Sequence, residues 1–530
     1  MDLQDKEMKV VLFLPRLDPG SGGDDQRPPL QLLALSGILL DKFSIVTIDA
    51  AIEDNYKGLV IQHCETAVCL GISCILGYQV YDGADVAREV KKRFPALPIV
   101  FGGWFPTVRP NIFFKEGIAD VVVRGHGEKT FLEVVNSFVK GIPLDNIQGI
   151  IYKKNDEIIT NSERLLVDMN ELPQMPYHLI DYERYISSSS YDRMKSNIRR
   201  RNSLLDRIGL PRIDPNIKTR TLHYFSSWGC PDNCTFCCSP GVTKRRWTAL
   251  DPLRMVNEIE GLIKKYDFNF VSFCDANFGV SEKRVKKFCE ELLKRDLKLN
   301  WIATAEARSI ERYGTDTLDS MAQSGCFAIF IGAESACMET ISLIGKHITP
   351  EEIEISVDRL TRKGILPLVS YVIGFPGESL NGINCTLEQI CKLYLKYPEM
   401  LARIFVYFPL PGSFSYSLAI KSGYVEPKTV EDWGSIRIDL INDSITHEST
   451  EKDALIRKII KLRDSYLYWG FNVRWERPRR HIMGRLLERS ARFRVRNRIF
   501  RFPVEFWLYD GLRKIYNGFS ITKGVISKAT

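Results

Sequence analysis

The sequence predicts an α/β fold with two successive units of alternating strands and helices, followed by a basic helical region. Short apolar strands alternate with helical segments in the first third of the chain, and the same alternation starts again near residue 221. Basic residues gather after residue 470. Strands that alternate with helices at these lengths form parallel sheets. We therefore expect an N-terminal doubly wound domain, a partial (β/α)6 barrel and a basic helical C-terminal region.

In the first unit, the expected strands lie at residues 10–14, 43–48, 66–75, 98–101 and 119–123. The expected helices lie at 30–40, 82–93, 107–115 and 129–140. Ligands of a doubly wound sheet bind beyond the carboxyl ends of its strands, where glycine lets the backbone approach closely. The loops that carry Gly71, Gly102 and Gly125 are therefore candidate binding loops. No Gly-x-Gly-x-x-Gly pattern opens the first helix, which argues against a dinucleotide site.

A hairpin at 150–160, a proline-stiffened linker at 172–178 and a polar basic connector at 193–215 separate the two units. The second unit has expected strands at 221–225, 270–274, 301–304, 328–332, 367–373 and 403–408. We assign residues 1–145 to the first domain, 146–218 to the hairpin and linker, 219–440 to the barrel and 441–530 to the C-terminal region. The active site of such a barrel lies at the carboxyl ends of its strands.

Length and composition are those of a globular protein with a substantial core, at 530 residues, 45% hydrophobic and 26% charged. Most of the thirteen cysteines stand singly in apolar runs, where reduced cysteine packs as a small hydrophobic side chain. This pattern predicts a reducing, cytoplasmic location. The charged first ten residues lack the apolar segment of a signal peptide, and no run of eighteen apolar residues occurs. We expect a protein that is neither exported nor membrane-spanning.

The net charge of +8 comes from the end of the chain. Residues 471–530 hold fifteen Lys/Arg against four Asp/Glu, and aromatic and aliphatic residues are interleaved with them. Three interpretations are open: a helical cap packed on the barrel, a helix on the inner membrane surface, or a nucleic-acid patch. No other part of the chain suggests a nucleic-acid module, so we expect no nucleic-acid partner.

A cysteine loop follows the first strand of the second unit. Its cysteines, Cys230, Cys234 and Cys237, have the spacing Cys-x3-Cys-x2-Cys. Three thiolates at this spacing can hold three corners of one cubane cluster and leave the fourth iron without a protein ligand. The spacing differs from paired zinc motifs and from ferredoxin runs, which supply a fourth cysteine. A zinc knuckle completed by Cys238 or a distant histidine is the alternative.

This loop resembles that of the radical SAM family, in which the open iron of a [4Fe-4S] cluster binds S-adenosylmethionine (SAM). The aromatic residue before the last cysteine also fits the resemblance. By position at successive strand ends, the resemblance implies SAM contacts from Phe236, Asp275, Asn277, Arg308, Glu334 and Ser335. Each of these could instead serve locally, for example Asp275 as a helix cap and Glu334 as a surface carboxylate.

The first unit resembles cobalamin-binding domains. Ser73-Cys74-Ile75 is followed by 26 residues and then Gly102-Gly103, close to the Ser-x-Leu and Gly-Gly elements of that family. Ordinary turn chemistry is the alternative. The family's Asp-x-His-x2-Gly element is missing, since His63 is the first histidine of the chain. The resemblance thus implies cobalamin without a protein histidine on cobalt. The implied contacts are Ser73, Gly102, Gly103 and Gly125, and we expect Arg27 or Trp104 to approach the lower face of the cofactor.

Together these resemblances imply a cobalamin-dependent radical SAM enzyme, similar to methyltransferases that act on an unactivated carbon, or phosphorus, of a small-molecule natural product or lipid-like substrate. Such cofactors supply chemistry that side-chain bases and nucleophiles cannot. An electron donor such as flavodoxin or ferredoxin is implied. A cyclase or rearrangement enzyme, similar to the anaerobic magnesium-protoporphyrin cyclase group, is the second hypothesis. A non-catalytic cobalamin or metal-binding sensor is the third.

Overall fold

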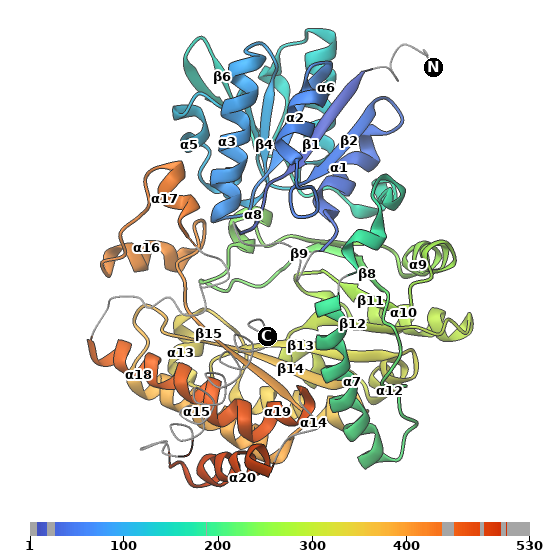
Figure 1. Cartoon of the computed structure of the whole chain (residues 1–530), viewed down its shortest axis with the longest axis vertical. Coiled ribbons are helices and arrows are strands. Elements are labelled where there is room, and N and C mark those ends of the chain that lie inside the picture. The colour runs from blue at the N-terminus through green and yellow to red at the C-terminus, as the bar shows by residue number, and fades with distance from the viewer. Residues whose placement is uncertain are drawn as a thin grey trace, which may run out of the picture.

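The computed structural model describes residues 8–18, 27–186, 188–436, 450–476, 482–499 and 505. Two α/β units are stacked along the long axis of the molecule, and C-terminal helices cover the far end of the second unit (Figure 1). This arrangement confirms the predicted fold class.

The sheet of the first unit has seven strands in the order β2-β1-β3-β4-β5-β6-β7. The first five pair in parallel, and β6 and β7 form an antiparallel hairpin that pairs with β5. The expected hairpin at 150–160 therefore belongs to this sheet, which extends past residue 145. The strands are β1 (Lys9–Leu14), β2 (Ser44–Asp49), β3 (Ala67–Ser73), β4 (Ile99–Gly102), β5 (Val121–Val123), β6 (Ile150–Lys154) and β7 (Glu157–Thr160).

Helices cover both faces of this sheet because the side chains of a strand alternate between its faces. In β1, Val10 and Leu12 pack into one apolar cluster with helices α1 and α6, whereas Val11 and Phe13 pack into another with α2 and α3. The helices of this unit are α1 (Leu30–Leu39), α2 (Tyr56–Cys64), α3 (Tyr78–Arg93), α4 (Trp104–Val108), α5 (Asn111–Lys115) and α6 (Glu128–Lys140).

The second unit is built on six parallel strands in the order β15-β14-β13-β12-β11-β8. Neighbours in this order are also neighbours in the sequence of parallel strands, as in a partial barrel, which the sequence predicted. The strands are β8 (Thr221–Tyr224), β11 (Phe270–Phe273), β12 (Asn300–Ala305), β13 (Cys326–Glu334), β14 (Leu366–Ile373) and β15 (Leu401–Val406). A small antiparallel pair, β9 (Ser227–Gly229) and β10 (Trp247–Ala249), flanks the cysteine loop.

The helices of this unit are α8 (Ser239–Thr243), α9 (Pro252–Tyr266), α10 (Glu282–Lys294), α11 (Ala307–Arg312), α12 (Thr315–Gln323), α13 (Met338–Leu343), α14 (Pro350–Arg362), α15 (Leu380–Lys396), α16 (Phe414–Lys421) and α17 (Val430–Gly434). Short 3-10 turns are Leu144–Asn146, Met169–Glu171, Tyr177–Leu179, Tyr182–Tyr185 and Phe278–Val280. Helix α17 returns to the first unit, where Trp433 is fully buried and packs edge-on against Phe105 with ring centroids 4.9 Å apart. The two units are therefore held together by packing as well as by the linker.

The segment expected as a polar connector, 193–215, is instead largely a helix, α7 (Ser188–Ile208). Its Arg200 and Arg201 are buried and donate hydrogen bonds to groups at the amino ends of the barrel strands. Arg200 Nη1 donates to the Met400 carbonyl at 3.3 Å, and Arg201 Nε donates to the Gly364 carbonyl at 3.1 Å. Arg200 and Arg201 are therefore buried hydrogen-bond donors that close the amino end of the barrel, and they are not solvated side chains of a loop.

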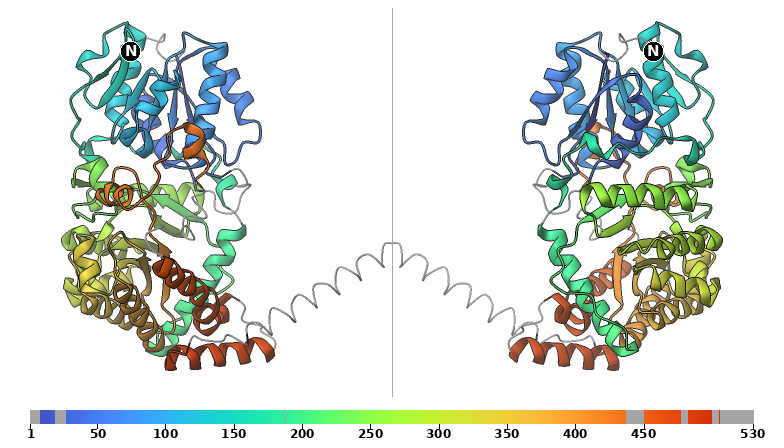
Figure 2. Two further views of the ribbon diagram at one scale, coloured as in Figure 1. Left: turned by 90° about the vertical axis from the view of Figure 1, so that its left-hand side faces the viewer. Right: turned by 90° about the vertical axis from the view of Figure 1, so that its right-hand side faces the viewer.

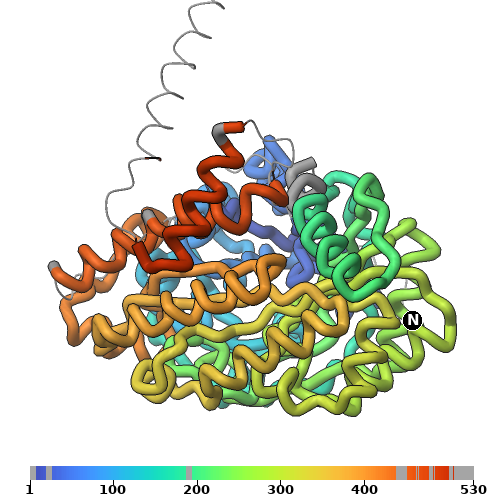
Figure 3. The backbone as a smooth tube through the Cα atoms, turned by 90° about the horizontal axis from the view of Figure 1, so that it is seen from below, coloured from blue at the N-terminus to red at the C-terminus, as the bar shows by residue number. Residues whose placement is uncertain are grey.

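The C-terminal helices lie beside α7 across the amino end of the barrel (Figure 3). They are α18 (Thr450–Leu462), the π-helix η8 (Arg463–Asn472), α19 (Val473–Glu476) and α20 (Ile482–Asn497). Their apolar residues, including Ile456, Phe471 and Leu487, join the core of the barrel. The described part of the tail is therefore packed on the barrel as a helical cap, the first of the three interpretations. Among the described residues, no helix has the length and apolar character needed to cross a bilayer.

Candidate active site

The three cysteines of the loop lie at the carboxyl end of β8. The turn that leads into them requires glycine at position 229, where φ is +80° and a Cβ would lie 2.0 Å from the Arg246 carbonyl oxygen. Cys230 and Cys237 are partly exposed, and Cys234 is buried. Burial raises the pKa of the Cys230 and Cys234 thiols to about 12. They would become thiolates by binding metal, which displaces the protons.

No three His, Cys, Asp or Glu side chains in the described part of the chain surround one point as the ligands of a single metal ion do. The cysteines of a cubane loop each bind a different iron, so their sulfurs need not converge in that way. The middle of the loop is held from outside: Thr235 donates its N–H to the Ile344 carbonyl at 2.8 Å, and Ser415 donates to the Thr235 carbonyl at 2.8 Å. Phe236 packs against Phe375, with ring centroids 5.4 Å apart, and does not line the cavity that opens beside Cys234.

A cavity of about 200 Å³ opens beside Cys234. We call it the loop cavity. Of the predicted SAM contacts, Asn277 and Arg308 line it. Asn277 Oδ1 is buried without a hydrogen-bond partner, and Arg308 Nε, 3.4 Å from Glu352 Oε1, also lacks a hydrogen bond. An unused acceptor and an unused guanidinium donor fit the ammonium and carboxylate groups of an amino-acid ligand such as SAM.

The loop cavity also holds a buried cation that the sequence did not reveal. Lys346 Nζ lies 3.0 Å from Glu306 Oε2 and 3.4 Å from Glu334 Oε1. Burial alone would lower the pKa of Lys346, but the two carboxylates raise it above its usual value. Burial raises the pKa of Glu334 despite the nearby ammonium. Glu334 itself has a left-handed backbone conformation, with φ at +60°. Such strained conformations occur more often at functional sites than elsewhere.

Two predicted SAM contacts instead hold the loops in place. Asp275 accepts hydrogen bonds from Ser226 N at 2.7 Å and from Ser227 Oγ at 2.6 Å, and it does not line the loop cavity. The buried Arg284 donates to Ser226 Oγ at 2.7 Å, so the Asp275 carboxylate and the Arg284 guanidinium together hold the start of the cysteine loop.

Ser335 has its own partners. Its Oγ lies 3.0 Å from Thr386 Oγ1 and accepts a hydrogen bond from Cys337 N. The sequence missed these partners because they lie far away along the chain.

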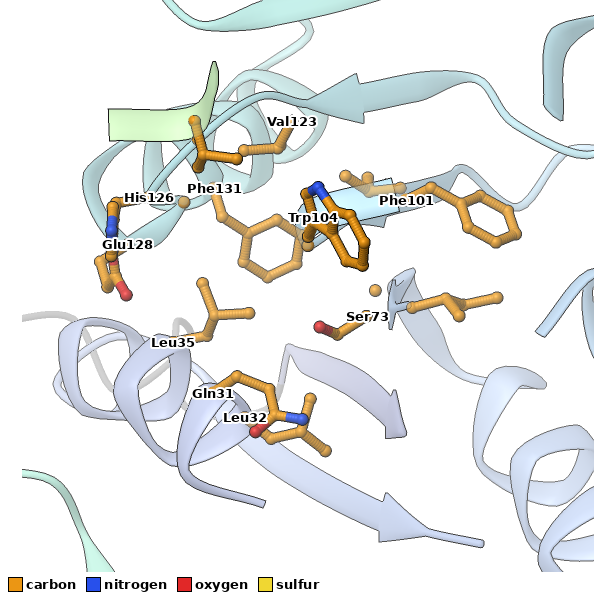
Figure 4. A pocket seen from close by; sticks show the side chains of 18 residues that line it. Gln31, Leu32, Leu35, Ser73, Phe101, Trp104, Val123, His126, Glu128 and Phe131 are labelled. Atoms are coloured by element: carbon orange, nitrogen blue, oxygen red, sulfur yellow. The ribbon is translucent and has the colours of Figure 1, made fainter. Parts of the chain in front are cut away.

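A second cavity, of about 230 Å³, lies beyond the carboxyl ends of β3, β4 and β5 (Figure 4). We call it the sheet cavity. Its walls are mostly apolar, and Val242 of the barrel unit contributes to them. The predicted cobalamin contacts Ser73, Gly102, Gly103, Trp104 and Gly125 all line it. Arg27 does not. Its side chain is exposed, and its charge acts on the Cys274 thiol after β11.

The glycines of the sheet cavity have distinct roles. Gly103 has φ +97°, and a Cβ there would lie 2.5 Å from the Cys74 carbonyl oxygen, so the backbone itself requires glycine. At Gly102 a Cβ would meet no atom closer than 3.9 Å, which leaves room for a ligand. The Trp104 Nε1 atom is buried without a partner. An apolar cavity with glycine floors and an unused donor fits a large, mostly apolar cofactor with amide groups.

His126 and Glu128 also line the sheet cavity, although the sequence pointed only to the glycine-bearing loop that holds them. Burial lowers the pKa of His126 to about 4 and raises the pKa of Glu128 to about 7, so both side chains favour their neutral forms. The His126 ring stacks on Trp228, two residues before Cys230. The segment 228–242 contributes to both cavities, through Val242 in the sheet cavity and Cys234 in the loop cavity.

Comparison with known proteins agrees with this geometry. The radical SAM superfamily model matches residues 225–390, and the B12 binding domain model matches residues 26–135. The chain is 26% identical over 489 residues to an uncharacterised methyltransferase of Pyrococcus horikoshii, covering 88% of this chain and 97% of that protein. It is 25% identical over 422 residues to the anaerobic magnesium-protoporphyrin IX monomethyl ester cyclase of Rubrivivax gelatinosus, covering 77% and 69%.

Among solved structures, the cobalamin-dependent S-adenosylmethionine radical enzyme OxsB with aqua-cobalamin and SAM bound has a TM-score of 0.69 at 17% identity, covering 96% of this chain and 75% of that chain. At this identity the likeness concerns the fold. The family matches favour a [4Fe-4S] cluster over a zinc knuckle at the cysteine loop. The chain is therefore a cobalamin-dependent radical SAM enzyme, in which a B12-binding domain precedes a radical SAM domain and whose cofactors are a [4Fe-4S] cluster, SAM and cobalamin.

Proposed function

We propose that this enzyme is a methyltransferase that acts on an unactivated carbon, or phosphorus, of a small-molecule substrate such as a natural product or a lipid-like compound. The observation that carries the proposal is the pair of cavities that both take lining residues from segment 228–242, one suited to SAM and one to cobalamin. The match to a named methyltransferase over nearly the whole of both chains supports the same outcome.

The cluster would be held by Cys230, Cys234 and Cys237. The amino and carboxylate groups of SAM would be held by Asn277 and Arg308, respectively. Lys346 and Glu306 line the loop cavity, and Lys346 would hold Glu334 behind its wall. Cobalamin would be contacted by the predicted residues that line the sheet cavity: Ser73, Gly102, Gly103, Trp104 and Gly125. When bound, the cluster and SAM supply hydrogen abstraction by a radical, and cobalamin supplies the methyl group. The residues of the chain bind and orient these groups and keep water from them.

We further propose that cobalt takes no histidine of this chain. This proposal rests on the missing Asp-x-His-x2-Gly element, since His126, on the wall of the sheet cavity, does not stand in such a pattern. We propose that Asp275 and Ser335 position the loops. Asp275 is hydrogen-bonded to Ser226 and Ser227, and Ser335 is hydrogen-bonded to Thr386. Phe236 packs in the apolar cluster behind the cysteine loop and would support it from there.

The test is anaerobic reconstitution with iron, sulfide and cobalamin, followed by reduction in the presence of SAM carrying a labelled methyl group. We expect 5′-deoxyadenosine and, with the right acceptor, a product heavier by one methylene unit. Candidate acceptors are screened by that mass. Failure to form 5′-deoxyadenosine with the cluster and cobalamin both loaded would favour a non-catalytic sensor.

A cyclase or rearrangement enzyme is the second candidate, and the similarity to magnesium-protoporphyrin cyclases favours it. It would use the same cavities and cofactors. Product mass separates the two functions, because ring formation or rearrangement adds no methyl group from SAM.

We propose a flavodoxin or ferredoxin as the electron donor, since the cluster of a radical SAM domain must be reduced by one electron from outside the chain. We also propose that the protein works in the cytoplasm and that its C-terminal region contacts the inner membrane surface at the periphery.

A further inference from the structure

We infer that the outward face of α20 is a docking surface for anionic lipid headgroups. This deepens the proposed membrane contact by naming the residues and the lipid charge, and it does not depend on the radical chemistry. Helix α20 lies at the end of the molecule farthest from the first unit (Figure 2). Contact there leaves both cavities clear of the membrane.

One face of α20 is committed to the protein. Leu487, Ala491 and Val495 are buried, at 3%, 0% and 0% exposure, against the π-helix η8. Arg492 Nε donates to the Gly470 carbonyl at 2.7 Å, and its Nη2 lies 3.1 Å from Glu488 Oε1. Glu488, the acidic residue of this helix, is thereby paired. The orientation of α20 is therefore fixed, and so is the face that it turns outward.

The outward face carries two parallel rows of side chains. At 3.6 residues per turn, Ile482, Leu486 and Phe493 fall on one stripe, and they are 74%, 53% and 62% exposed. Arg485, Arg489 and Arg496 fall on the neighbouring stripe and are also exposed. In the described part of the chain no carboxylate pairs with these three arginines. An apolar row beside a row of unpaired arginines is the pattern of a helix that lies in a membrane interface.

Charge decides among the possible occupants. Residues 477–481 add three arginines next to the helix, and residues 500–530 hold five Lys/Arg against two Asp/Glu. A second copy of the face would therefore repel the arginine row. The described residue of the end of the chain, Glu505, pairs with Arg494 and Ser490 of α20 and not with the arginine row. Nucleic acid would match the arginines but would leave the apolar row in water. A bilayer with anionic headgroups accepts both rows, since phosphates pair with arginine and the acyl boundary takes the aliphatic and aromatic side chains.

The test is sedimentation of the full-length, cofactor-loaded protein with vesicles of phosphatidylcholine alone or with added phosphatidylglycerol. We expect binding only to the anionic vesicles, and loss of that binding at high salt. Replacing the arginine row (Arg485→Gln, Arg489→Gln and Arg496→Gln) should weaken binding about a hundred-fold, at about five-fold for each arginine. Replacing two apolar residues (Leu486→Ser and Phe493→Ser) should weaken it roughly ten-fold or more.

A matched triple variant, Lys294→Gln, Lys298→Gln and Arg312→Gln, removes the same charge from other exposed positions and should bind nearly as the natural protein does. SAM cleavage and helix content should be unchanged in all three variants, because every altered side chain is exposed. The inference is overturned if the natural protein ignores anionic vesicles, or if the matched variant loses as much binding as the arginine variant. It is also overturned if the apolar row instead mediates a dimer in sedimentation velocity, or if an oligonucleotide binds this face more tightly than vesicles do.

Discussion

The imidazole of His126 stacks on the indole of Trp228, with ring centroids 4.6 Å apart and an angle of 25° between the planes. His126 belongs to the wall of the sheet cavity, and Trp228 belongs to β9, just before the first cysteine of the cluster loop. This contact joins the cobalamin-binding domain to the segment that would hold the iron–sulfur cluster.

We expect this stack to appear as an energetic coupling between the two residues. In a double-mutant cycle of His126→Ala and Trp228→Ala, the coupling free energy should be about 0.5–1.5 kcal/mol, the range for aromatic pairs. Trp228→Ala alone should cost about 3–5 kcal/mol because its indole is buried. Urea unfolding of the cofactor-free protein measures both. Strict additivity of the two single changes would mean that the stack carries no energy.

Glu128 should make the stability of the cofactor-free protein fall as pH rises. Its pKa is raised by burial to about 7 from 4.5, so the folded state keeps a proton that the unfolded state loses. The stability is complete below pH 4.5 and declines as pH rises to about 7, by about 3 kcal/mol. Glu128→Gln should remove this decline.

The measurement is the difference in unfolding free energy between Glu128→Gln and the natural protein, followed from pH 5 to pH 8. His126 acts in the opposite sense, because its lowered pKa, about 4, gives stability that is lost as pH falls below 6.5. It is present in both proteins and cancels in the difference. Glu157→Gln, at an exposed strand position, serves as the control. A difference that does not change with pH would contradict the assigned burial of Glu128.

Cys234→Ala should abolish cluster binding and SAM cleavage and leave cobalamin binding nearly intact, because the cysteine loop and the sheet cavity belong to different domains. Iron and sulfide content, 5′-deoxyadenosine formation and bound cobalamin are measured on the reconstituted protein. Cys385→Ala, a partly exposed cysteine on α15, should keep all three. Loss of cobalamin alone in Cys234→Ala would overturn the assignment of the two domains.

Gly102→Val should weaken cobalamin binding roughly ten-fold or more, since overpacking costs about 1–3 kcal/mol. A Cβ at this position meets no protein atom within 3.9 Å, so the added side chain would occupy the sheet cavity. Equilibrium dialysis with hydroxocobalamin provides the measurement. Gly261→Val on α9, where a Cβ also meets open space, should bind cobalamin as the natural protein does. Full affinity in Gly102→Val would place the cofactor elsewhere.

Lys346→Met should destabilise the protein by about 3–5 kcal/mol, because it leaves Glu306 and Glu334 beside each other without a cation. SAM binding to the cluster-loaded protein should weaken as well. Adding Glu306→Gln and Glu334→Gln to Lys346→Met should restore most of the stability, since no uncompensated charge remains. If the triple variant is less stable than Lys346→Met, the three groups do not form one electrostatic unit.

The sequence alone determined the order of the two α/β units, the cysteine loop and the glycine-bearing strand ends. These features depend on the spacing of residues along the chain: periods of two and 3.6 residues, a Cys-x3-Cys-x2-Cys run, and a gap of 26 residues before Gly102. Short-range spacing is a property of the sequence itself, so the prediction needed no contact between distant residues.

Only the tertiary structure decided the partners of the polar side chains. It placed Asp275 on Ser226 instead of the loop cavity, brought Lys346 between two carboxylates from other strand ends, and turned the arginine run of α7 inward to close the barrel. Each of these contacts joins residues that are 12 to 163 positions apart. The sequence does not distinguish a solvated polar side chain from a buried one. Its environment depends on which strands and helices, distant along the chain, pack around it.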